Sequence, residues 1–191
     1  MGLGAAHLKV LVTGGGGFLG GAILRQLADK ATVRRSFSRG DYPELADQGV
    51  VHLQGSLSDY AAVHAAVEGM DVVYHTAALP GAWGSFDTYF QANVVGSRNI
   101  LKAARAHGVK AIVYTSTPSV VHADEGIRGA DESIPLSTHF LAHYPHTKAI
   151  AEQEMLAANS NDLRICALRP HLIWGPGDRH LIPRLVDRAR R

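Results

Sequence analysis

Short apolar runs alternate along this chain with stretches in which apolar residues recur at helical spacing. Lys9 to Thr13 is a β-branched apolar run of strand length, and Phe18 to Leu27 then carries apolar side chains every three or four residues. This alternation recurs along the chain and is typical of βαβ units that build a parallel sheet. It predicts six strands, at residues 9–13, 32–37, 50–53, 71–76, 111–115 and 163–168, and helices that include 18–27, 86–107 and 144–158.

Right-handed crossovers and short connections restrict how such strands are arranged. They favour an α/β fold with a doubly wound parallel sheet of the Rossmann type, in the strand order 3-2-1-4-5-6. Ligands bind in such sheets at the carboxyl ends of the strands, where the strand order reverses. The segment after the first strand, residues 14–20, lies at that point.

Composition excludes several classes of protein. The chain has 191 residues, of which 46% are hydrophobic, so it can form one domain with a sizeable core. The net charge of +2 is small and argues against a nucleic-acid surface. The single cysteine, Cys166, excludes a disulfide within the chain and is expected to be buried on a strand. No apolar run approaches the ~18 residues of a membrane span, and Met1 to Ala6 lacks a charged signal-peptide region, so we expect a cytoplasmic protein.

A glycine-rich turn joins the first strand to the first helix. Glycine permits a sharp turn and leaves the backbone amides of a helix N-terminus open to a pyrophosphate. The turn therefore predicts a dinucleotide site. Two spacings fit equally, G-x-G-x-x-G from Gly15 and G-x-x-G-x-x-G from Gly14. The candidate cofactor-binding residues here are Gly14, Gly15, Gly16, Gly17, Phe18, Leu19 and Gly20.

The end of the second strand distinguishes NAD from NADP. NAD-binding sheets carry an acidic residue about 20 positions after the glycines, where it accepts hydrogen bonds from the adenosine ribose. This chain has Ser38 and Arg39 there, and a hydroxyl beside a guanidinium can bind and neutralise a 2′-phosphate. We predict NADP(H) as the preferred cofactor and keep NAD(H) as the alternative. In that alternative Arg39 is a solvated surface residue and Asp41 takes the acidic role.

Residues after the third and fourth strands are expected to line the same cofactor. Ser56 is a candidate for a hydrogen bond to the adenine ring and Leu57 for packing on its face. The alternative is that this segment only begins a helix, with Ser58 or Asp59 as its cap. Ala77 and Ala78, after the fourth strand, leave room for the phosphates and ribose.

Three further residues have candidate roles in or near the site. His75 is expected to be a packed strand residue rather than a site residue. Trp83 is a candidate contact for a hydrophobic substrate, in a loop of turn-forming residues. Asn93 either braces the backbone of the active site or bonds locally on its own helix.

A hydroxyl cluster and a Tyr–Lys pair carry the candidate chemistry. Thr115, Ser116 and Thr117 lie at the carboxyl end of the fifth strand, where ligands bind in this fold class. Tyr144 and Lys148 are four residues apart at the start of a helix and therefore share one face. A phenol with a pKa of about 10 is a poor proton exchanger at neutral pH, and a nearby ammonium favours its ionised form. The pair is thus a candidate general acid/base with its activator.

These motifs resemble those of the extended short-chain dehydrogenase/reductase family over essentially the whole chain. The resemblance lies in Thr13 to Gly20, Thr115 to Thr117, Tyr144-x-x-x-Lys148 and Arg169 to Asp178. Within that family the sequence is similar to the 3β-hydroxysteroid dehydrogenase-like branch, and particularly to its 2-alkyl-3-oxoalkanoate reductases of bacterial olefin biosynthesis. That similarity lies in residues 36–43, 82–84, 114–120 and 168–178.

The resemblance implies roles for individual residues. Tyr144 would be the general acid/base, Lys148 would hold the nicotinamide ribose and tune the tyrosine, and Thr117 would hydrogen-bond the reacting oxygen. Ser116 takes the last role if the register shifts by one residue, and Thr115 contacts the cofactor. The implied activity is NADP(H)-dependent reduction of a 2-alkyl-3-oxoalkanoate to the 2-alkyl-3-hydroxyalkanoate.

Other functions stay open from the sequence. A 3β-hydroxysteroid or sterol dehydrogenase uses the same residues, and a nucleotide-sugar epimerase or dehydratase shares the framework but usually selects NAD. A non-catalytic NADP-binding sensor is a further alternative, because a fold does not establish a function. The run His139, His143 and His146 suggests a metal, but Pro145 interrupts the helical spacing and no metal is expected.

The last residues are expected to begin a second unit. We assign residues 1–178 to an NAD(P)-binding Rossmann domain and 179–191 to the start of a truncated substrate-binding lobe, most of which is missing. Apolar residues recur at helical spacing from His180 to Arg191, which predicts an amphipathic helix. The expected partner is a small hydrophobic ketone or alcohol, with no nucleic acid and no transmembrane segment, in either a homodimer or an association with other pathway enzymes.

Overall fold

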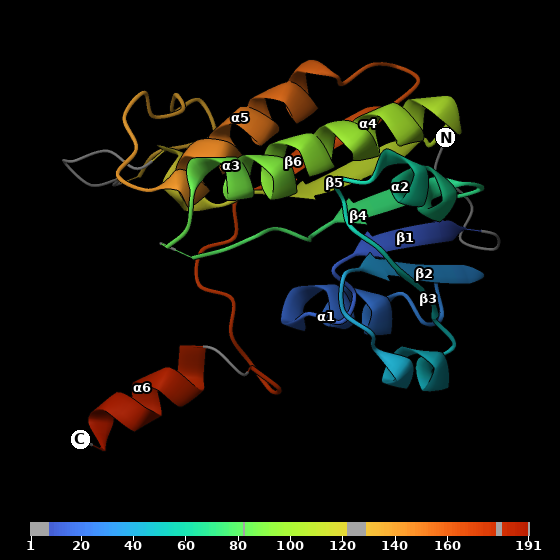
Figure 1. Ribbon diagram of the computed structural model, residues 1–191, viewed down its shortest axis with the longest axis horizontal. Coiled ribbons are helices and arrows are strands. Elements are labelled where there is room, and N and C mark those ends of the chain that lie inside the picture. The colour runs from blue at the N-terminus through green and yellow to red at the C-terminus, as the bar shows by residue number, and fades with distance from the viewer. Residues whose placement is uncertain (1–7, 82, 122–128, 179–180, 191) are drawn as a thin grey trace.

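The protein folds around one parallel sheet. The computed structural model describes residues 8–81, 83–121, 129–178 and 181–190. Within these ranges, six strands lie in the order β3-β2-β1-β4-β5-β6, and every neighbouring pair is parallel (Figure 1). The strands are β1 (Lys9–Thr13), β2 (Val33–Ser38), β3 (Val51–Gln54), β4 (Val72–His75), β5 (Ala111–Thr115) and β6 (Arg164–Leu168). The predicted doubly wound sheet and its strand order are confirmed.

Helices cover both faces of the sheet. Helices α2, α4 and α5 lie on one face and α1 lies on the other (Figure 1). The bounds are α1 (Phe18–Gln26), α2 (Tyr60–Val67), α3 (Phe86–Tyr89), α4 (Gly96–Ala106), α5 (His143–Ala157) and α6 (Leu181–Ala189), with 3-10 turns at Pro43–Gln48 and Pro118–Val121.

The central strand β1 is buried on both faces. Leu11 belongs to the large apolar cluster under α2, α4 and α5, whereas Val10 and Val12 pack toward α1. All three side chains are fully buried, as expected for a central parallel strand. Burial of a side chain of this size contributes about 1.5–3 kcal/mol. The core therefore fixes the end of β1, and with it the turn that follows.

The predicted helix at residues 86–107 is not one regular α-helix. A π turn, Phe90–Val95, separates α3 from α4. Asn93 lies inside this turn, and its side chain bonds residues outside its own helix rather than locally. Its Oδ1 accepts from the Leu79 amide at 2.7 Å, and its Nδ2 donates to the Leu79 carbonyl and to Thr147 Oγ1. These bonds offset the poorer backbone geometry of a π turn, which is frequent at functional sites.

The expectation that Cys166 is buried is wrong. In the described sheet β6 is an edge strand, and α5 covers the face to which Ile165 points. Cys166 points to the opposite face and is exposed, like Leu168 on the same strand. The apolar run correctly predicted a strand, but it carried no information on which faces are covered.

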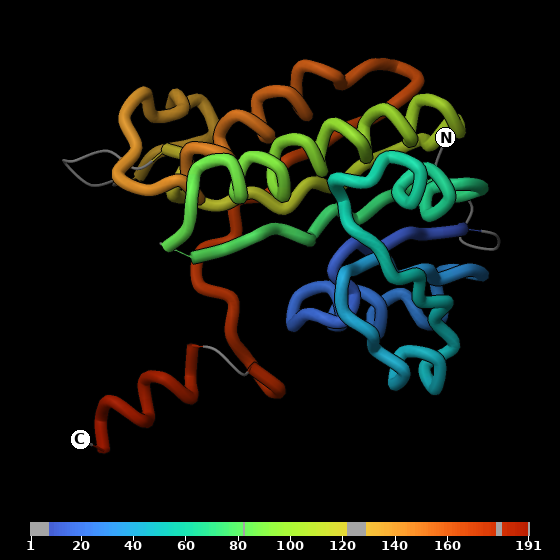
Figure 2. The backbone as a smooth tube through the Cα atoms, in the orientation of Figure 1, coloured from blue at the N-terminus to red at the C-terminus, as the bar shows by residue number. Residues whose placement is uncertain are grey.

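Helix α6 lies apart from the sheet (Figures 1 and 2). Its helical spacing is as predicted, and none of its residues is buried. Residues 179, 180 and 191 of the predicted second unit and the chain start at 1–7 lie outside the described residues. The assignment of 179–191 to a second lobe stays a prediction. Among the described helices, none combines the length and apolar character needed to cross a membrane.

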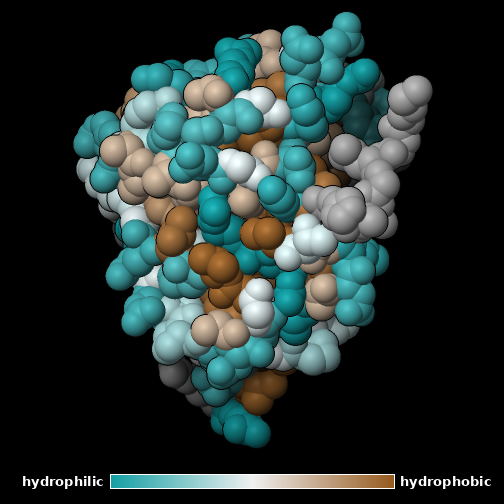
Figure 3. All heavy atoms as spheres, turned by 90° about the vertical axis from the view of Figure 1, so that its right-hand side faces the viewer, coloured by the Kyte–Doolittle hydropathy of each residue, from teal (hydrophilic) through white to brown (hydrophobic). Residues whose placement is uncertain are grey.

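The two ends of the sheet differ. Figure 3 shows the side at which β1 and β2 begin, where the surface is largely hydrophilic with a small hydrophobic group near its centre. The cavities described below lie at the opposite end, where the strands finish. The site is therefore at the carboxyl ends of the strands, as predicted.

A chain of buried hydrogen bonds crosses the core. Ser97 donates its hydroxyl proton to the Asn93 carbonyl at 2.6 Å, so it accepts from His75 Nε2, at 3.1 Å. His75 Nδ1 then accepts from the Thr13 hydroxyl at 2.8 Å. His75 is thus a neutral, packed strand residue, as expected. Burial, together with the smaller effect of the positive charge of Lys148, lowers its pKa to about 3.

This pKa shift predicts a pH dependence of folding stability. The unfolded chain takes up a proton at His75 below pH 6.5, which the folded protein accepts only near pH 3. The stability contributed by the neutral ring is therefore complete above pH 6.5 and is lost as the pH falls toward 3. We expect His75→Gln to lower the free energy of unfolding at pH 7 by about 1–3 kcal/mol, because buried hydrogen bonds are lost.

At pH 4 the deficit of His75→Gln relative to wild type should shrink, since only the wild type is penalised by protonation of this ring. Urea denaturation of both proteins at the two pH values measures it. An equal deficit at both pH values would contradict the buried neutral histidine.

Candidate active site

Two neighbouring cavities contain most of the predicted site residues. The larger has a volume of about 610 Å³ and the smaller about 250 Å³, and both are lined by Thr76 and Ala78. Predicted residues that line the larger cavity are Gly14, Gly17, Ser38, Arg39, Ser56, Leu57, Ala77 and Ala78. Those that line the smaller are Leu19, Ala78, Thr115, Ser116, Thr117 and Tyr144. Neither lining includes Gly15, Gly16, Phe18, Gly20 or Lys148.

The glycine turn uses Gly14, Gly17 and Gly20. Gly14 has a φ of 73°, a conformation that favours glycine, and the Gly17 amide donates to its carbonyl at 2.9 Å. A Cβ at Gly20 would overlap the Gly14 carbonyl. A Cβ at Gly15 would overlap the Ser36 and Leu24 side chains, so this glycine is required for packing against β2 and α1, whereas Gly17 and Gly20 pack on the Gly14 carbonyl itself. The structure thus favours the G-x-x-G-x-x-G spacing, which the sequence left undecided.

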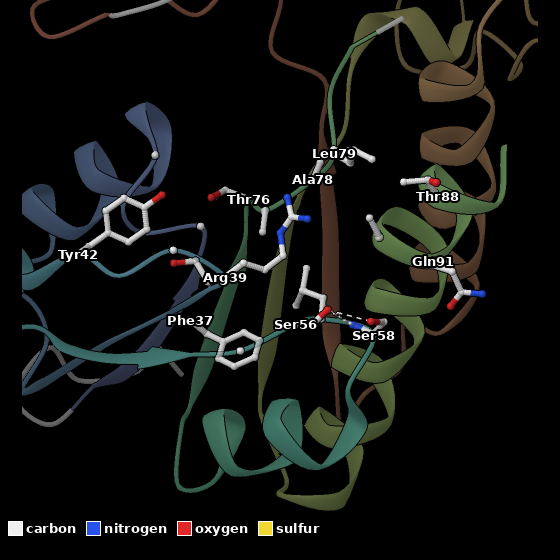
Figure 4. A pocket seen from close by; sticks show the side chains of 18 of the residues that line it. Phe37, Arg39, Tyr42, Ser56, Ser58, Thr76, Ala78, Leu79, Thr88 and Gln91 are labelled. Carbon is white, nitrogen blue, oxygen red and sulfur yellow. Dashed lines mark hydrogen bonds between the residues drawn. The ribbon is translucent and has the colours of Figure 1, made fainter. Parts of the chain in front are cut away.

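The larger cavity is lined by the residues predicted to bind the adenosine part of a dinucleotide. The Arg39 side chain extends into it toward Thr76, with Tyr42 on one side and Thr88 and Gln91 opposite (Figure 4). Ser38 Oγ is buried and has no hydrogen-bond partner among the described residues. A buried hydroxyl without a partner is costly, and a phosphate oxygen would satisfy it.

The other arginines of β2 are not available to a ligand. Arg34 Nη1 donates to the Leu24 carbonyl at 3.1 Å, and Arg35 Nη1 donates to the Ala66 carbonyl at 2.7 Å. Both side chains thereby satisfy carbonyls near the ends of helices. Of Arg34, Arg35 and Arg39, it is therefore Arg39 that lines the larger cavity.

Ser56 and Leu57 line the larger cavity ahead of α2. The cap of that helix is Asp59, whose carboxylate accepts from the amides of Ala61 and Ala62. Ser58 is therefore not the cap, and its hydroxyl lies 2.8 Å from Ser56 Oγ instead. The contact of Ser56 and Leu57 with an adenine ring stays a prediction.

Tyr144 and Thr117 meet at the smaller cavity. Burial raises the pKa of the Tyr144 phenol, and a hydrogen bond with the Thr117 side chain partly offsets this. Ser116 Oγ lines the same cavity, buried and without a partner in the described part of the chain. Of the two residues, Thr117 contacts the phenol, and the choice of Thr117 over Ser116 as catalytic hydroxyl stays a prediction.

Lys148 is held at the carboxyl end of β5. Its Nζ donates to the Thr115 carbonyl at 2.7 Å and lies 4.1 Å from the centre of the Tyr114 ring. Burial lowers the pKa of Lys148 to about 7, and the Glu152 carboxylate opposes this shift. Burial is the largest influence on the Tyr144 pKa, which it raises, and the activation of Tyr144 by Lys148 stays a prediction.

A buried ion pair links the helix of Tyr144 to the wall of the smaller cavity. Arg169 Nε donates to Glu152 Oε1 at 3.0 Å, and only 1% of the Glu152 side chain is exposed. Glu152 lies one turn after Lys148 on α5, and Arg169 directly precedes Pro170 and His171, which line the smaller cavity. This pair was not among the residues predicted from the sequence. The spacing of four between Lys148 and Glu152 was the available signal.

The histidines near Tyr144 contact aromatic rings. The His143 and His146 rings lie 5.6 and 5.3 Å from the ring of Phe86, and Phe140 stacks on His146. Among the described residues, no group of three or more metal-binding side chains is placed to hold an ion. The proposed substrate contact of Trp83 finds no support, since this side chain is 94% exposed and lines neither cavity.

Comparisons with known proteins agree with this geometry. Residues 11–191 match the 3-beta hydroxysteroid dehydrogenase/isomerase family. A 2-alkyl-3-oxoalkanoate reductase of Stenotrophomonas maltophilia is 54% identical over 96% of this chain and 56% of its own length. A 3 beta-hydroxysteroid dehydrogenase/Delta 5-->4-isomerase of Mycobacterium tuberculosis is 40% identical over 94% of this chain and 50% of its own.

The solved structure of MoeE5 in complex with UDP-glucuronic acid and NAD shares the fold, with a TM-score of 0.80 and 29% identity. It covers 95% of this chain and 60% of its own. The chain spans about half the length of the curated relatives it matches.

The buried ion pair generates a test of stability. Glu152→Gln should lower the free energy of unfolding by about 3 kcal/mol, near the lower end for buried pairs because Arg169 is partly exposed. The double variant Glu152→Met/Arg169→Met should recover most of the loss, since no charge is left without a partner. Urea denaturation at pH 7 measures each.

The matched control is the more exposed pair of Arg98 and Glu154. Arg98→Ala should cost less than about 1 kcal/mol, as is usual for surface ion pairs. A loss as large as that of Glu152→Gln, or a double variant no better than the single one, would contradict our interpretation.

Proposed function

This chain belongs to the 3-beta hydroxysteroid dehydrogenase/isomerase family, and from that premise we propose that the protein is an NADP(H)-dependent reductase. Its proposed reaction converts a 2-alkyl-3-oxoalkanoate into the 2-alkyl-3-hydroxyalkanoate. The observation that carries the proposal is the meeting of Thr117, Ser116 and Tyr144 at the smaller cavity, in a chain 54% identical to a reductase of that name. A cytoplasmic location, and assembly as a homodimer or with other pathway enzymes, stay predictions.

The larger cavity would hold the adenosine half of the cofactor. The amides of the Gly14–Gly20 turn at the start of α1 suit the pyrophosphate. Ser38 and Arg39 suit a 2′-phosphate, because one supplies a hydroxyl without a partner and the other a guanidinium. The small side chains of Ala77 and Ala78 leave space where the two cavities meet. The cofactor, when bound, supplies the hydride that reaches the carbonyl carbon.

Tyr144 would supply the proton that the reduced oxygen needs. A general acid must carry its proton at the start of the step, and burial, which raises the Tyr144 pKa, keeps the phenol protonated at neutral pH. The proton passes from the phenol to the carbonyl oxygen as the hydride reaches the carbon. Thr117, or Ser116 beside it, would donate a hydrogen bond to that oxygen and stabilise its developing charge.

Lys148 would act through the nicotinamide ribose rather than by direct contact with the phenol. Its ammonium is held at the end of β5 by the Thr115 carbonyl. That position beside the smaller cavity suits a hydrogen bond to ribose hydroxyls. Since its pKa is about 7, a modest rise in pH would remove its charge.

A 3β-hydroxysteroid dehydrogenase is the second candidate, supported by the family match and by the mycobacterial relative. Both activities use the same hydride and the same acid. They differ in substrate, because a 3-oxo acid carries a carboxylate beside the ketone and a steroid is neutral. Assay of both ketones with NADPH and the full-length gene product separates the two functions.

The role of Tyr144 can be tested in the same assay. General-acid catalysis contributes typically about 10²–10⁴-fold, so Tyr144→Phe should lower kcat on the 3-oxo acid by that factor. Its NADPH affinity should stay close to wild type, because the ring remains. Tyr60→Phe, on α2 and outside both cavity linings, is the control and should leave kcat unchanged. Near wild-type turnover of Tyr144→Phe would remove this residue from the role.

The preference for NADPH over NADH has its own test. Arg39→Ala removes one charge-assisted contact with the 2′-phosphate, which should cost about 1.5–3 kcal/mol of NADPH binding and little of NADH binding. Titration of both cofactors against both proteins gives the four dissociation constants. Equal losses for the two cofactors, or an intrinsic preference for NADH, would refute the assignment.

A further inference from the structure

Three consecutive carbonyls, from the last residue of β2 onward, accept hydrogen bonds from β3 or from the residue that follows it. The Gly55 amide donates to the Ser38 carbonyl at 2.9 Å, at the point where both strands end. Gln54 Nε2 donates to the Arg39 carbonyl at 2.8 Å, and His52 Nε2 donates to the Gly40 carbonyl at 2.9 Å. The loop that carries Arg39 is thus fixed at each successive residue, and two of the three bonds come from side chains.

His52 also ties this loop to the glycine turn. Its Nδ1 lies 3.2 Å from the hydroxyl of Ser36, a buried residue that packs against Gly15. The Tyr42 ring meets the His52 ring edge-on, with 5.6 Å between centres, and lies over Gly16, where a Cβ would overlap it. His52 therefore holds the loop at Gly40 and also contacts Ser36 and Tyr42, which pack against Gly15 and Gly16 of the glycine turn.

Gln54 and His52 are separated from the ligand space. Neither lines the larger cavity, whereas the residues whose backbone they hold, Arg39 and Gly40, do. The Arg39 side chain extends into that cavity (Figure 4). Among the described residues its guanidinium has no hydrogen bond or ion pair, so no neighbouring side chain fixes its position. Its placement depends on the backbone of its own loop.

We propose that Gln54 and His52 are positioning residues for cofactor selection, which hold the Arg39 loop in the conformation that binds a 2′-phosphate. The inference rests on the proposed preference for NADPH. A phosphate bound by a mobile loop pays for ordering that loop, and a loop already ordered in the free protein avoids the loss. NADH has no 2′-phosphate, so its affinity does not depend on how the loop places the Arg39 side chain. Loss of either side chain should therefore weaken NADPH selectively.

Gln54→Leu and His52→Phe test the proposal by direct binding. Each removes a hydrogen bond to the loop, and each preserves the approximate size of the side chain. The dissociation constants of NADPH and NADH are measured from the fluorescence of the bound dihydronicotinamide, which needs no turnover. We expect NADPH to bind roughly two- to tenfold more weakly to each variant, as befits one lost hydrogen bond, and NADH to change by less than about twofold. Gln153→Leu, at an exposed glutamine of α5, is the matched control and should change neither.

A double variant distinguishes positioning from a direct contact. If Gln54 acts through Arg39, then Gln54→Leu should weaken NADPH no further in an Arg39→Ala background. An additive loss would show that Gln54 contributes independently of Arg39 and would overturn the proposal. A purely structural role would lower the melting temperature and weaken both cofactors alike.

The outcomes separate this inference from the cofactor assignment on which it rests. A wild type that binds NADH as tightly as NADPH removes the assignment itself. A wild type that prefers NADPH, with variants that keep its full preference or lose both cofactors equally, overturns only the positioning role. Because Gln54 is exposed, its substitution should leave folding intact, and it decides the question by itself if His52→Phe does not fold.

Discussion

The site depends on a chain of buried hydrogen bonds that joins the glycine turn to the helix of Tyr144. The chain runs from Thr13 through His75 and Ser97 to Asn93, and from the Asn93 amide to Thr147. Every one of these side chains is buried, so an unmade bond would leave a polar group without a partner. The chain therefore fixes the end of β4, and Thr76, which directly follows His75, lines both cavities.

The π turn, Phe90–Val95, belongs to the same network of buried hydrogen bonds through Asn93. Asn93 holds both the amide and the carbonyl of Leu79, in the loop that follows β4, and also reaches Thr147 on α5. Thr147 in turn donates to the His143 carbonyl in the first turn of that helix. The loop beside the cavities and the helix that carries the phenol are thus fixed by one amide side chain.

Charge in the core is arranged to keep one cation close to the reaction site. Lys148 is buried, and its cation is balanced by the Glu152 carboxylate one turn away, which Arg169 holds in place. His75 and Tyr114, on the neighbouring strands, are both kept neutral by burial. Because Arg169 follows β6 directly, the same ion pair also fixes the direction in which the chain leaves the sheet toward Pro170 and His171. The Glu152–Arg169 pair therefore has two effects: its carboxylate balances the charge of Lys148, and its guanidinium fixes the path of the chain after β6.

Local sequence determined the strands, the glycine turn and the Tyr144–Lys148 spacing, because periodicity, turn chemistry and helical repeat act between near neighbours in the chain. The strand order followed from the handedness of the crossovers between parallel strands. Local sequence did not determine what these residues touch. The choice among Gly14, Gly15 and their neighbours, the exposure of Cys166, and the attachment of Lys148 to Thr115 all depend on which strand ends lie side by side. The partners of Asn93, Glu152 and the Arg39 loop likewise come from other elements. Tertiary structure decided them, because a buried polar group takes whichever partner the packed core brings within reach.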